Sequence, residues 1–172
     1  MTATVLVAYA SKHGATAEIA ERIAAAITAS GDVADVRPVT EVRDVARYDA
    51  VVLGSAVYYG RWQGDARAFL RRHGHALRER PTWLFSSGPT GGSPQADAAV
   101  ARAVETPDSS LPRELLGAVE RIQVRGHATF PGRVDETMNG LLERWMPRGD
   151  WRDLDRVAAW GASIASQLER EM

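Results

Sequence analysis

Apolar and polar residues along this chain follow two different periods, and each period predicts its own kind of element. Runs that are apolar on both faces, with one shorter alternating run, are typical of strands in a sheet covered by helices. Strands are predicted at Val5–Tyr9, Val33–Pro38, Ala50–Ser55, Thr82–Ser87 and Ile122–Val124, the last with Phe130 as its furthest end. Apolar residues at helical spacing predict helices at Thr16–Ser30, Asp65–Leu77, Ala96–Val104, Leu115–Val119, Thr137–Trp145 and Leu154–Leu168, and a short helix or loop at Val45–Arg47.

Five strands that alternate with helices predict an α/β fold in which helices cover both faces of a parallel sheet. The chain has 172 residues, which suits a single domain over residues 1–172. No internal repeat, linker or low-complexity tract divides it. The longest irregular span, from Gly88 to about Pro112, fits either a flap over a ligand or a surface loop.

The loop after the first strand is the first candidate binding segment, because open parallel sheets bind ligands beyond the carboxyl ends of their strands. It offers two hydroxyls, a lysine and backbone N–H groups at the positive end of a helix dipole, which is typical of a phosphate site. Its residues are Ser11, Lys12, His13, Gly14, Ala15 and Thr16. The alternative is a plain strand-to-helix turn with Thr16 near the N-cap. Neither the Walker A pattern nor the dinucleotide pattern GxGxxG occurs.

The loops after the third and fourth strands complete the candidate site. Three large rings within five residues suit stacking on a flat ring system, and a glycine between them permits close approach. The third strand is followed by Ala56, Val57, Tyr58, Tyr59, Gly60, Arg61 and Trp62. The fourth ends in a loop that would edge the same ring, with Ser87, Gly88, Pro89, Thr90 and Gly91. The alternative interpretations are rings packed on the next helix and an ordinary flexible turn.

The composition narrows the chemistry that these loops can support. The chain has no cysteine, so redox chemistry would need a bound cofactor. Its four histidines form no HExxH pattern, and no metal site is predicted. A net charge of −1 without a basic stripe argues against nucleic acid as a partner. No apolar run has the length of a transmembrane segment, and the first strand leaves no room for a signal peptide, so a cytoplasmic location is predicted.

The three loops together resemble those of the flavodoxin family. The residues that match its signature are Val7, Tyr9, Ser11, Gly14, Thr16, Ala20 and Ile23. His13 stands where flavodoxins usually carry Thr, and Ala15 where they often carry Asn, so the first loop is a variant. The stretch from Gly54 to Trp62 is similar to the second flavin loop of the menaquinone-dependent protoporphyrinogen dehydrogenases, and this similarity extends over nearly the whole chain.

The resemblance implies a flavodoxin-like three-layer sandwich with a five-stranded parallel sheet of order 2-1-3-4-5, and FMN as the cofactor. The FMN phosphate would lie on Ser11–Thr16, and the isoalloxazine between Ala56–Trp62 and Ser87–Gly91. Tyr58 or Trp62 would be the stacking ring, and the backbone near Gly60 would meet the N5 edge of the flavin. The chemistry would belong to the flavin, with no catalytic side chain.

Three functions are consistent with these residues. The favoured one is an FMN-dependent oxidoreductase acting on protoporphyrinogen or a quinone, and the others are an electron-carrier flavodoxin and a binding or regulatory module with a degenerate FMN site. Electron-carrier flavodoxins are typically strongly acidic. This chain is nearly neutral and has Arg61 in the flavin loop, which favours the oxidoreductase. A small-molecule or protein redox partner is expected. Peripheral membrane contact and a homodimer are compatible with the sequence, the dimer because of a sheet edge and five tryptophans.

Overall fold

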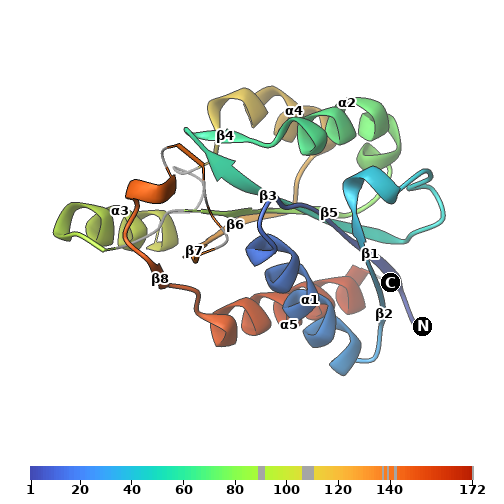
Figure 1. Cartoon of the computed structure of the whole chain (residues 1–172). Coiled ribbons are helices and arrows are strands. Elements are labelled where there is room, and N and C mark those ends of the chain that lie inside the picture. The colour runs from blue at the N-terminus through green and yellow to red at the C-terminus, as the bar shows by residue number, and fades with distance from the viewer. Residues whose placement is uncertain (89–91, 106–110, 137, 139, 142, 172) are drawn as a thin grey trace.

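A parallel β-sheet runs through the centre of the molecule, with helices on both faces (Figure 1). The computed structural model describes residues 1–88, 92–105, 111–136, 138, 140–141 and 143–171. The parallel strands are β1 (Thr4–Ala10), β2 (Val33–Pro38), β3 (Ala50–Tyr58), β5 (Thr82–Ser87) and β6 (Gly126–Phe130). They lie in the order β2-β1-β3-β5-β6, which confirms the predicted order 2-1-3-4-5 of the five parallel strands.

Neighbouring strands place branched and aromatic side chains side by side. Val7 on β1 is paired with Val36 on β2 and with Val52 on β3, and Val52 is paired with Trp83 on β5. Such side chains pack well on a pleated surface. The inner strands β1 and β3 are buried on both faces over most of their length, which is why their sequences are continuously apolar.

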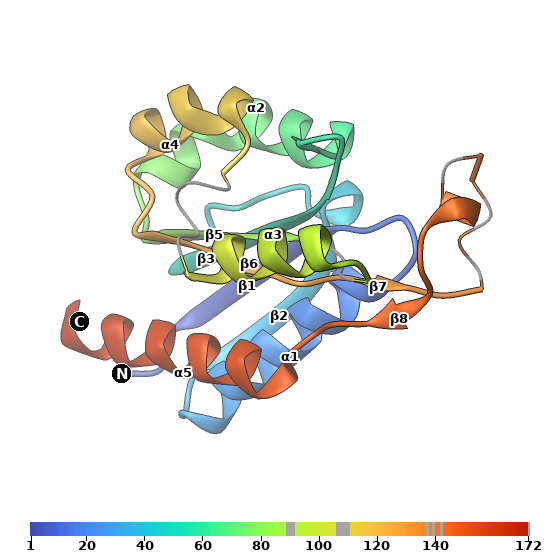
Figure 2. The ribbon, with the colours of Figure 1, turned by 90° about the vertical axis from the view of Figure 1, so that its left-hand side faces the viewer.

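Helices cover the two faces of the sheet in pairs. Their bounds are Ala15–Ala29 for α1, Gly64–Arg78 for α2, Pro94–Glu105 for α3, Leu116–Ile122 for α4 and Leu154–Glu171 for α5. Figure 1 shows α1 beside α5 on one face and α2 beside α4 on the other. Figure 2 shows α3 next to the edge strand β6. Each face has its own hydrophobic core, with Ile23 of α1 in one and Phe69 of α2 in the other.

α5 passes very close to α1 at Gly161. A Cβ atom at this position would lie 2.8 Å from the carbonyl oxygen of Ile23 and 3.0 Å from the Cβ of Ala26. A glycine is therefore needed where the two helices cross. Ile164 and Leu168, further along α5, join the core that α1 covers. This packing fixes the position of α1, whose N-terminus borders the candidate site.

A β-hairpin replaces the loop predicted after the third strand. β3 continues beyond Ser55 to Tyr58 and pairs antiparallel with β4 (Arg61–Trp62). Tyr59 and Gly60 form the turn, with φ angles of 52° and 72°. Two consecutive residues with positive φ give the tight turn that matches the twist of paired strands. The aromatic residues of this segment are therefore held by strand pairing.

The C-terminal third departs further from the predicted elements. Ile122 ends α4 and does not begin a strand, because Gln123 adopts a left-handed conformation with φ of 55° that stops the helix. The described residues of the predicted helix 137–145 contain only a short 3-10 turn, η4 (Glu143–Trp145). Gly140 lowers the helix propensity of this stretch. Around it the chain forms a two-stranded ribbon of β7 (Arg133–Val134) and β8 (Gly149–Asp150).

Two more 3-10 turns connect the larger elements. η1 (Val39–Glu41) follows β2, while residues 45–47, predicted as a short helix or loop, form turns. η3 (Arg113–Leu115) leads directly into α4, so this helix begins and ends slightly later than predicted.

We expect Gly161→Ala to destabilise the protein, because the added methyl group collides with the backbone of α1. Forcing a methyl group into packed space costs about 1–3 kcal/mol, which outweighs the ~1 kcal/mol that alanine gains over glycine in a helix. Urea titration measures the free energy of unfolding. Gly74→Ala in α2 is the control and should be stabilising, since a Cβ there meets nothing within 4 Å. Unchanged or greater stability of Gly161→Ala would contradict the close helix contact.

Candidate functional site

A cavity of about 960 Å³ lies at the carboxyl ends of β1, β3 and β5. Its walls are the loop after β1, the β3–β4 hairpin with the start of α2, the end of β5, and the chain around β7. Small-molecule sites typically have volumes of about 300–1,000 Å³. β1 lies between β2 and β3, so the strand order reverses here, which is where open parallel sheets bind ligands.

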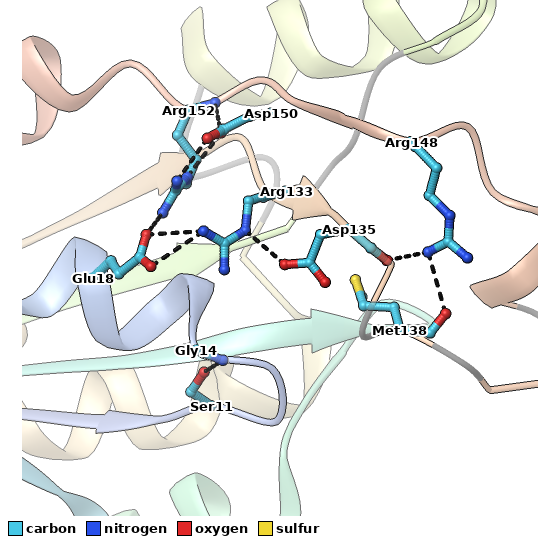
Figure 3. A network of polar contacts seen from close by, with 9 residues as sticks. All are labelled: Ser11, Gly14, Glu18, Arg133, Asp135, Met138, Arg148, Asp150 and Arg152. Atoms are coloured by element: carbon cyan, nitrogen blue, oxygen red, sulfur yellow. Dashed lines mark hydrogen bonds and ion pairs between the residues drawn. The ribbon is translucent and has the colours of Figure 1, made fainter.

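The loop after β1 turns the chain directly into α1. Gly14 is the N-cap of α1 and has a φ of 86°, a left-handed conformation that suits glycine. The Ser11 hydroxyl oxygen accepts a 3.0 Å hydrogen bond from the Gly14 N–H, which closes the turn (Figure 3). The residues of this loop that line the cavity are Ser11, Lys12, His13, Ala15 and Thr16. The structure thus places the predicted anion-binding residues together at the start of a helix.

The β3–β4 hairpin forms an aromatic wall next to this loop. Tyr58 is half-buried, and the Nζ of Lys12 lies 5.8 Å from the centre of its ring. Tyr59, at the tip of the hairpin, is 80% exposed. Both tyrosines line the cavity, as do Ala56 and Val57. Because a cation above an aromatic ring is attracted to it, Lys12 links the loop after β1 to the hairpin.

Trp62 is part of the hydrophobic core beneath the hairpin, although it also borders the cavity. Its side chain is 1% exposed and packs in the core that α2 covers. Its indole N–H donates a 2.9 Å hydrogen bond to the Ser86 hydroxyl, which lies 2.9 Å from the Nε2 of His127. These buried contacts fix the base of the hairpin to β5 and β6. Of the two rings predicted to stack on a flavin, Tyr58 keeps more exposed surface.

The end of β5 forms the third predicted wall. Ser87 is buried, and the Gly88 N–H donates a 3.0 Å hydrogen bond to the carbonyl oxygen of Phe130. A Cβ on Gly88 would lie 3.1 Å from the Cβ of Val57, so this segment packs tightly against β3. Ser87 and Gly88 line the cavity. The other residues predicted here, Pro89, Thr90 and Gly91, lie outside the described residues.

Sequence reasoning missed the fourth wall, which we call the C-terminal wall. Its described residues are Gly132, Arg133, Val134, Met138, Gly140, Leu141 and Met146. The sequence predicted a helix at residues 137–145, so a cavity wall was not expected in this stretch. Its glycines, which disfavour a helix, are the available signal in the sequence. Two polar residues at the start of α2, Gln63 and Arg67, also line the cavity and were missed, whereas Arg61 on β4 belongs to the predicted aromatic loop.

An ion-pair network fastens the C-terminal wall to the first turn of α1 (Figure 3). Glu18 of α1 lies 3.1 Å from the Nη1 of Arg133 and also pairs with Arg152. Arg152 pairs with Asp150 at 2.6 Å, and the Nε of Arg133 lies 3.1 Å from Asp135. The side chain of Arg152 is only 6% exposed, so its charge depends on these partners. The network joins residues far apart in the sequence at the edge of the cavity.

These contacts keep the network charged. The hydrogen bond from Arg152 is the largest cause that lowers the pKa of Glu18, and it also lowers the pKa of Asp150. In return, the hydrogen bond to Asp150 raises the pKa of Arg152. Arg148 adds hydrogen bonds to the carbonyl oxygens of Asp135 and Met138, the latter at 3.2 Å. The C-terminal wall is therefore held by charge and hydrogen bonding at neutral pH.

The described walls of the cavity are positively charged. Lys12, Arg61, Arg67 and Arg133 line it together with His13, and no Asp or Glu of the described residues does so. Positive walls of this kind attract anionic ligands. In the described ranges, no group of three His, Cys, Asp or Glu residues is placed to hold a metal ion. Within the same part of the chain, no helix is both long and apolar enough to cross a membrane.

Comparison with known proteins identifies the family. A profile of the flavodoxin domain matches residues 6–148. The chain belongs to the flavodoxin-domain family. Protoporphyrinogen IX dehydrogenase [quinone] of Escherichia coli strain K12 is 29% identical over 83 residues, which is 47% of this chain and 46% of that protein. The similarity thus spans about half the length of this curated relative. Membership of the flavodoxin-domain family implies FMN as the cofactor.

Solved flavodoxin structures have the same fold. A flavodoxin from the domain Archaea has a TM-score of 0.62 at 15% identity and covers 96% of this chain and 99% of its own. The two-electron reduced flavodoxin of Megasphaera elsdenii has a TM-score of 0.57 at 19% identity, with 94% and 98% covered. A WrbA-like flavodoxin from Agrobacterium tumefaciens has a TM-score of 0.61 at 13% identity, with 99% and 100% covered. These likenesses confirm the flavodoxin-like α/β sandwich.

We expect Glu18→Gln to weaken the attachment of the C-terminal wall, because an amide cannot form ion pairs with two arginines. Glu18 is 46% exposed, so after screening by water the loss in unfolding free energy should be about 1 kcal/mol or less. The folded-state pKa of Glu18 lies below its ordinary value. The advantage of the wild type is therefore full at neutral pH and disappears as the pH falls through that folded-state pKa.

Urea titration of both proteins at neutral and acidic pH measures this difference. Glu169→Gln, which removes an exposed carboxylate of α5, is the control and should not lose stability as Glu18→Gln does. A difference between wild type and Glu18→Gln that does not change with pH would contradict the ion-pair account.

Proposed function

We propose that this flavodoxin-domain protein is an FMN-dependent oxidoreductase that passes electrons between a small reduced donor and a quinone-type acceptor. The observation that carries the proposal is the cavity at the carboxyl ends of β1, β3 and β5. It combines the start of a helix, a half-buried aromatic ring and cationic walls. FMN has the matching parts, namely a phosphate, a polar chain and a flat ring system.

The residues of the cavity fit FMN. The first N–H groups of a helix have no partner within it, so those of α1 would hold the phosphate in the loop Ser11–Thr16, which we call the phosphate loop. The ring system would lie between the hairpin at Tyr58 and the end of β5 at Ser87 and Gly88. Bound FMN would supply reversible electron transfer, while the side chains of the cavity orient it and set its electrostatic surroundings.

Positive charge near the phosphate loop supports this fit despite the variant residues. His13 and Ala15 give the loop fewer hydroxyls than the flavodoxin signature has. Lys12 lies in the same loop, and Arg133 lines the cavity while its guanidinium pairs with Glu18 in the first turn of α1. Lys12 would attract the phosphate in place of the lost hydroxyls, and Arg133, whose charge Glu18 and Asp135 balance, would add N–H donors.

The charge of the cavity supports an oxidoreductase over an electron carrier. Arg61, on the hairpin, is 63% exposed, and Arg67 lies behind it on the same wall. Cations beside a flavin favour its negatively charged reduced form and so raise its potential. The E. coli relative is named for a reaction between protoporphyrinogen IX and a quinone. Its similarity to half of this chain supports the same reaction class, with protoporphyrinogen as the first substrate to test.

The location, oligomeric state and partners of the protein also belong to the proposal. A cytoplasmic location, a homodimer and contact with a membrane surface stay predictions from the sequence. A flavodoxin-type redox protein acts with a redox partner, and the exposed Tyr59 at the mouth of the cavity would be among the first residues to meet it.

Anaerobic redox titration of the purified protein loaded with FMN tests the proposed function. We expect reduction by a porphyrinogen or by NADPH, and reoxidation by menaquinone or, once air is admitted, by oxygen. A two-electron potential as low as that of carriers that replace ferredoxin would favour an electron-carrier flavodoxin instead. Colourless protein that takes up no FMN would favour a binding module with a degenerate site.

We expect Thr16→Ala to weaken FMN binding at least tenfold. Thr16 lines the cavity in the first turn of α1, and its side chain is 1% exposed. Its hydroxyl would donate to the phosphate, and a hydrogen bond to a charged group contributes about 1.5–3 kcal/mol. Quenching of FMN fluorescence gives the dissociation constant. Thr28→Ala, at an exposed position on the same helix, should bind FMN like the wild type. Unchanged affinity of Thr16→Ala would move the phosphate to another site.

We expect Tyr58→Ala and Trp62→Phe to have different effects. Tyr58→Ala should shift the absorption spectrum or the potential of bound FMN, because its half-buried ring borders the cavity. Trp62→Phe should instead lower the free energy of unfolding by about 1–3 kcal/mol, since it leaves the buried Ser86 hydroxyl without its indole donor. Spectra and urea titrations of both variants measure this. A flavin spectrum that changes as much in Trp62→Phe as in Tyr58→Ala would make Trp62 the stacking ring.

A further inference from the structure

The cations of the cavity form two groups on opposite faces of the sheet. Lys12 precedes α1, and Arg133 is paired with Glu18 of the same helix. Arg61 and Arg67 belong to β4 and α2, and α2 covers the other face (Figure 1). A phosphate at the start of α1 accounts for the first group. The second group would act on the flavin through its charge, and no polar atom of FMN has been assigned to it as a hydrogen-bond partner.

Two buried donors beside this second group lack acceptors. The Nε of Arg67 and the Nε2 of Gln63 are buried, and neither has a hydrogen-bond partner. Both residues line the cavity. The backbone N–H of Gln63 donates a 3.0 Å hydrogen bond to the Ser55 hydroxyl, so the main chain that carries the amide is anchored to β3. Buried donors without acceptors are costly, and a rotation of either side chain toward the cavity would let a ligand with acceptor oxygens remove this cost.

Glu114 does not neutralise both arginines. Its Oε2 lies 2.9 Å from the Nε of Arg61 and 3.5 Å from the Nη1 of Arg67. Its Oε1 accepts a 3.1 Å hydrogen bond from the Trp62 N–H, which ties the carboxylate to the hairpin backbone. Two guanidinium groups and one carboxylate leave a net positive charge. Arg67 makes the longer contact and its side chain is 32% exposed, so the N–H groups at the end of its guanidinium can reach a ligand.

We propose that Arg61, Gln63 and Arg67 form a second anion subsite of the cavity, which binds a carboxylate group of the electron donor or acceptor. The inference rests on the proposed function, because it assigns the class of substrate that meets the cofactor. A carboxylate has two acceptor oxygens in one plane, which suits the planar fork of an arginine and the N–H groups of an amide. The subsite therefore selects acidic substrates over neutral ones of the same shape.

A pair of naphthoquinones tests the subsite, one carrying a propionate side chain and the other its methyl ester. Calorimetry on the oxidised, FMN-loaded protein gives the dissociation constant of each, and reoxidation of the reduced protein gives kcat/KM. We expect the wild type to prefer the acid at least tenfold and Arg67→Gln to lose this preference. Arg71→Gln removes an exposed arginine of α2 that does not line the cavity, and it should keep the preference.

Glu114→Gln should change the preference in the opposite direction. Glutamine keeps an oxygen that can accept from the Trp62 N–H but removes the negative charge that competes with a bound carboxylate. The affinity for the propionate should therefore rise several-fold, and the affinity for the methyl ester should rise less. A simple loosening of the hairpin would instead weaken the binding of both compounds.

Three results would overturn the subsite. The first is a wild type that does not prefer the acid. The second is a preference for the acid that falls equally in Arg67→Gln and Arg71→Gln. The third is an affinity that falls equally for acid and ester in Arg67→Gln, which would assign the donors of Arg67 to the flavin ring. FMN uptake is read separately from the absorption spectrum before any quinone is added. If no FMN is taken up, the proposed function fails. Calorimetry with the acid and the ester on the FMN-free protein then still shows whether the subsite prefers the acid.

Discussion

The reversal of strand order at β1 creates the space on which the site depends. The chain passes from β1 through α1 to β2, which lies next to β1 on one side, whereas β3, β5 and β6 lie on the other side of β1. Because the two crossovers run in opposite directions along the sheet, α1 and α2 cover opposite faces. Both helices start at the carboxyl edge of the sheet, where their N-termini border one cavity. The close contact of α5 at Gly161 and the core around Phe69 hold the two helices in place.

Charge in this space is arranged so that the cavity stays positive while its arginines are held firmly. Arg133 and Arg61 both line the cavity, and each is paired with a carboxylate that does not. Glu18 supports Arg133 from the first turn of α1, and Glu114 supports Arg61 from the 3-10 turn before α4. An acidic residue behind each arginine fixes its side chain without lining the cavity. The same device thus occurs at both ends of the proposed cofactor and substrate site.

The sequence predicted an element correctly where the period of its apolar residues matches the way the element is buried. Continuous apolar runs predicted β1, β3 and β5, and the hydroxyl and glycine residues after β1 predicted a turn that opens α1 beside the cavity. Long-range contacts were not predictable in this way. Trp62 is buried because its indole reaches Ser86, and Arg133 is held by Glu18, which is 115 residues away in the sequence. A local pattern contains no information about such partners, so it left the packing of Trp62 on α2 as one of two alternatives and did not show the C-terminal wall.

The affinity for FMN compared with riboflavin measures what the phosphate contributes to binding, because the two ligands differ only in this group. In the proposed site, this phosphate would lie on the backbone N–H groups and hydroxyls of the loop Ser11–Thr16, with Lys12 beside it. Two charge-assisted hydrogen bonds of about 1.5–3 kcal/mol each predict that FMN binds about 100-fold more tightly or better. Fluorescence titration of the FMN-free protein with each ligand measures the ratio. Equal affinities for FMN and riboflavin would contradict the assignment of the α1 N-terminus as the phosphate site.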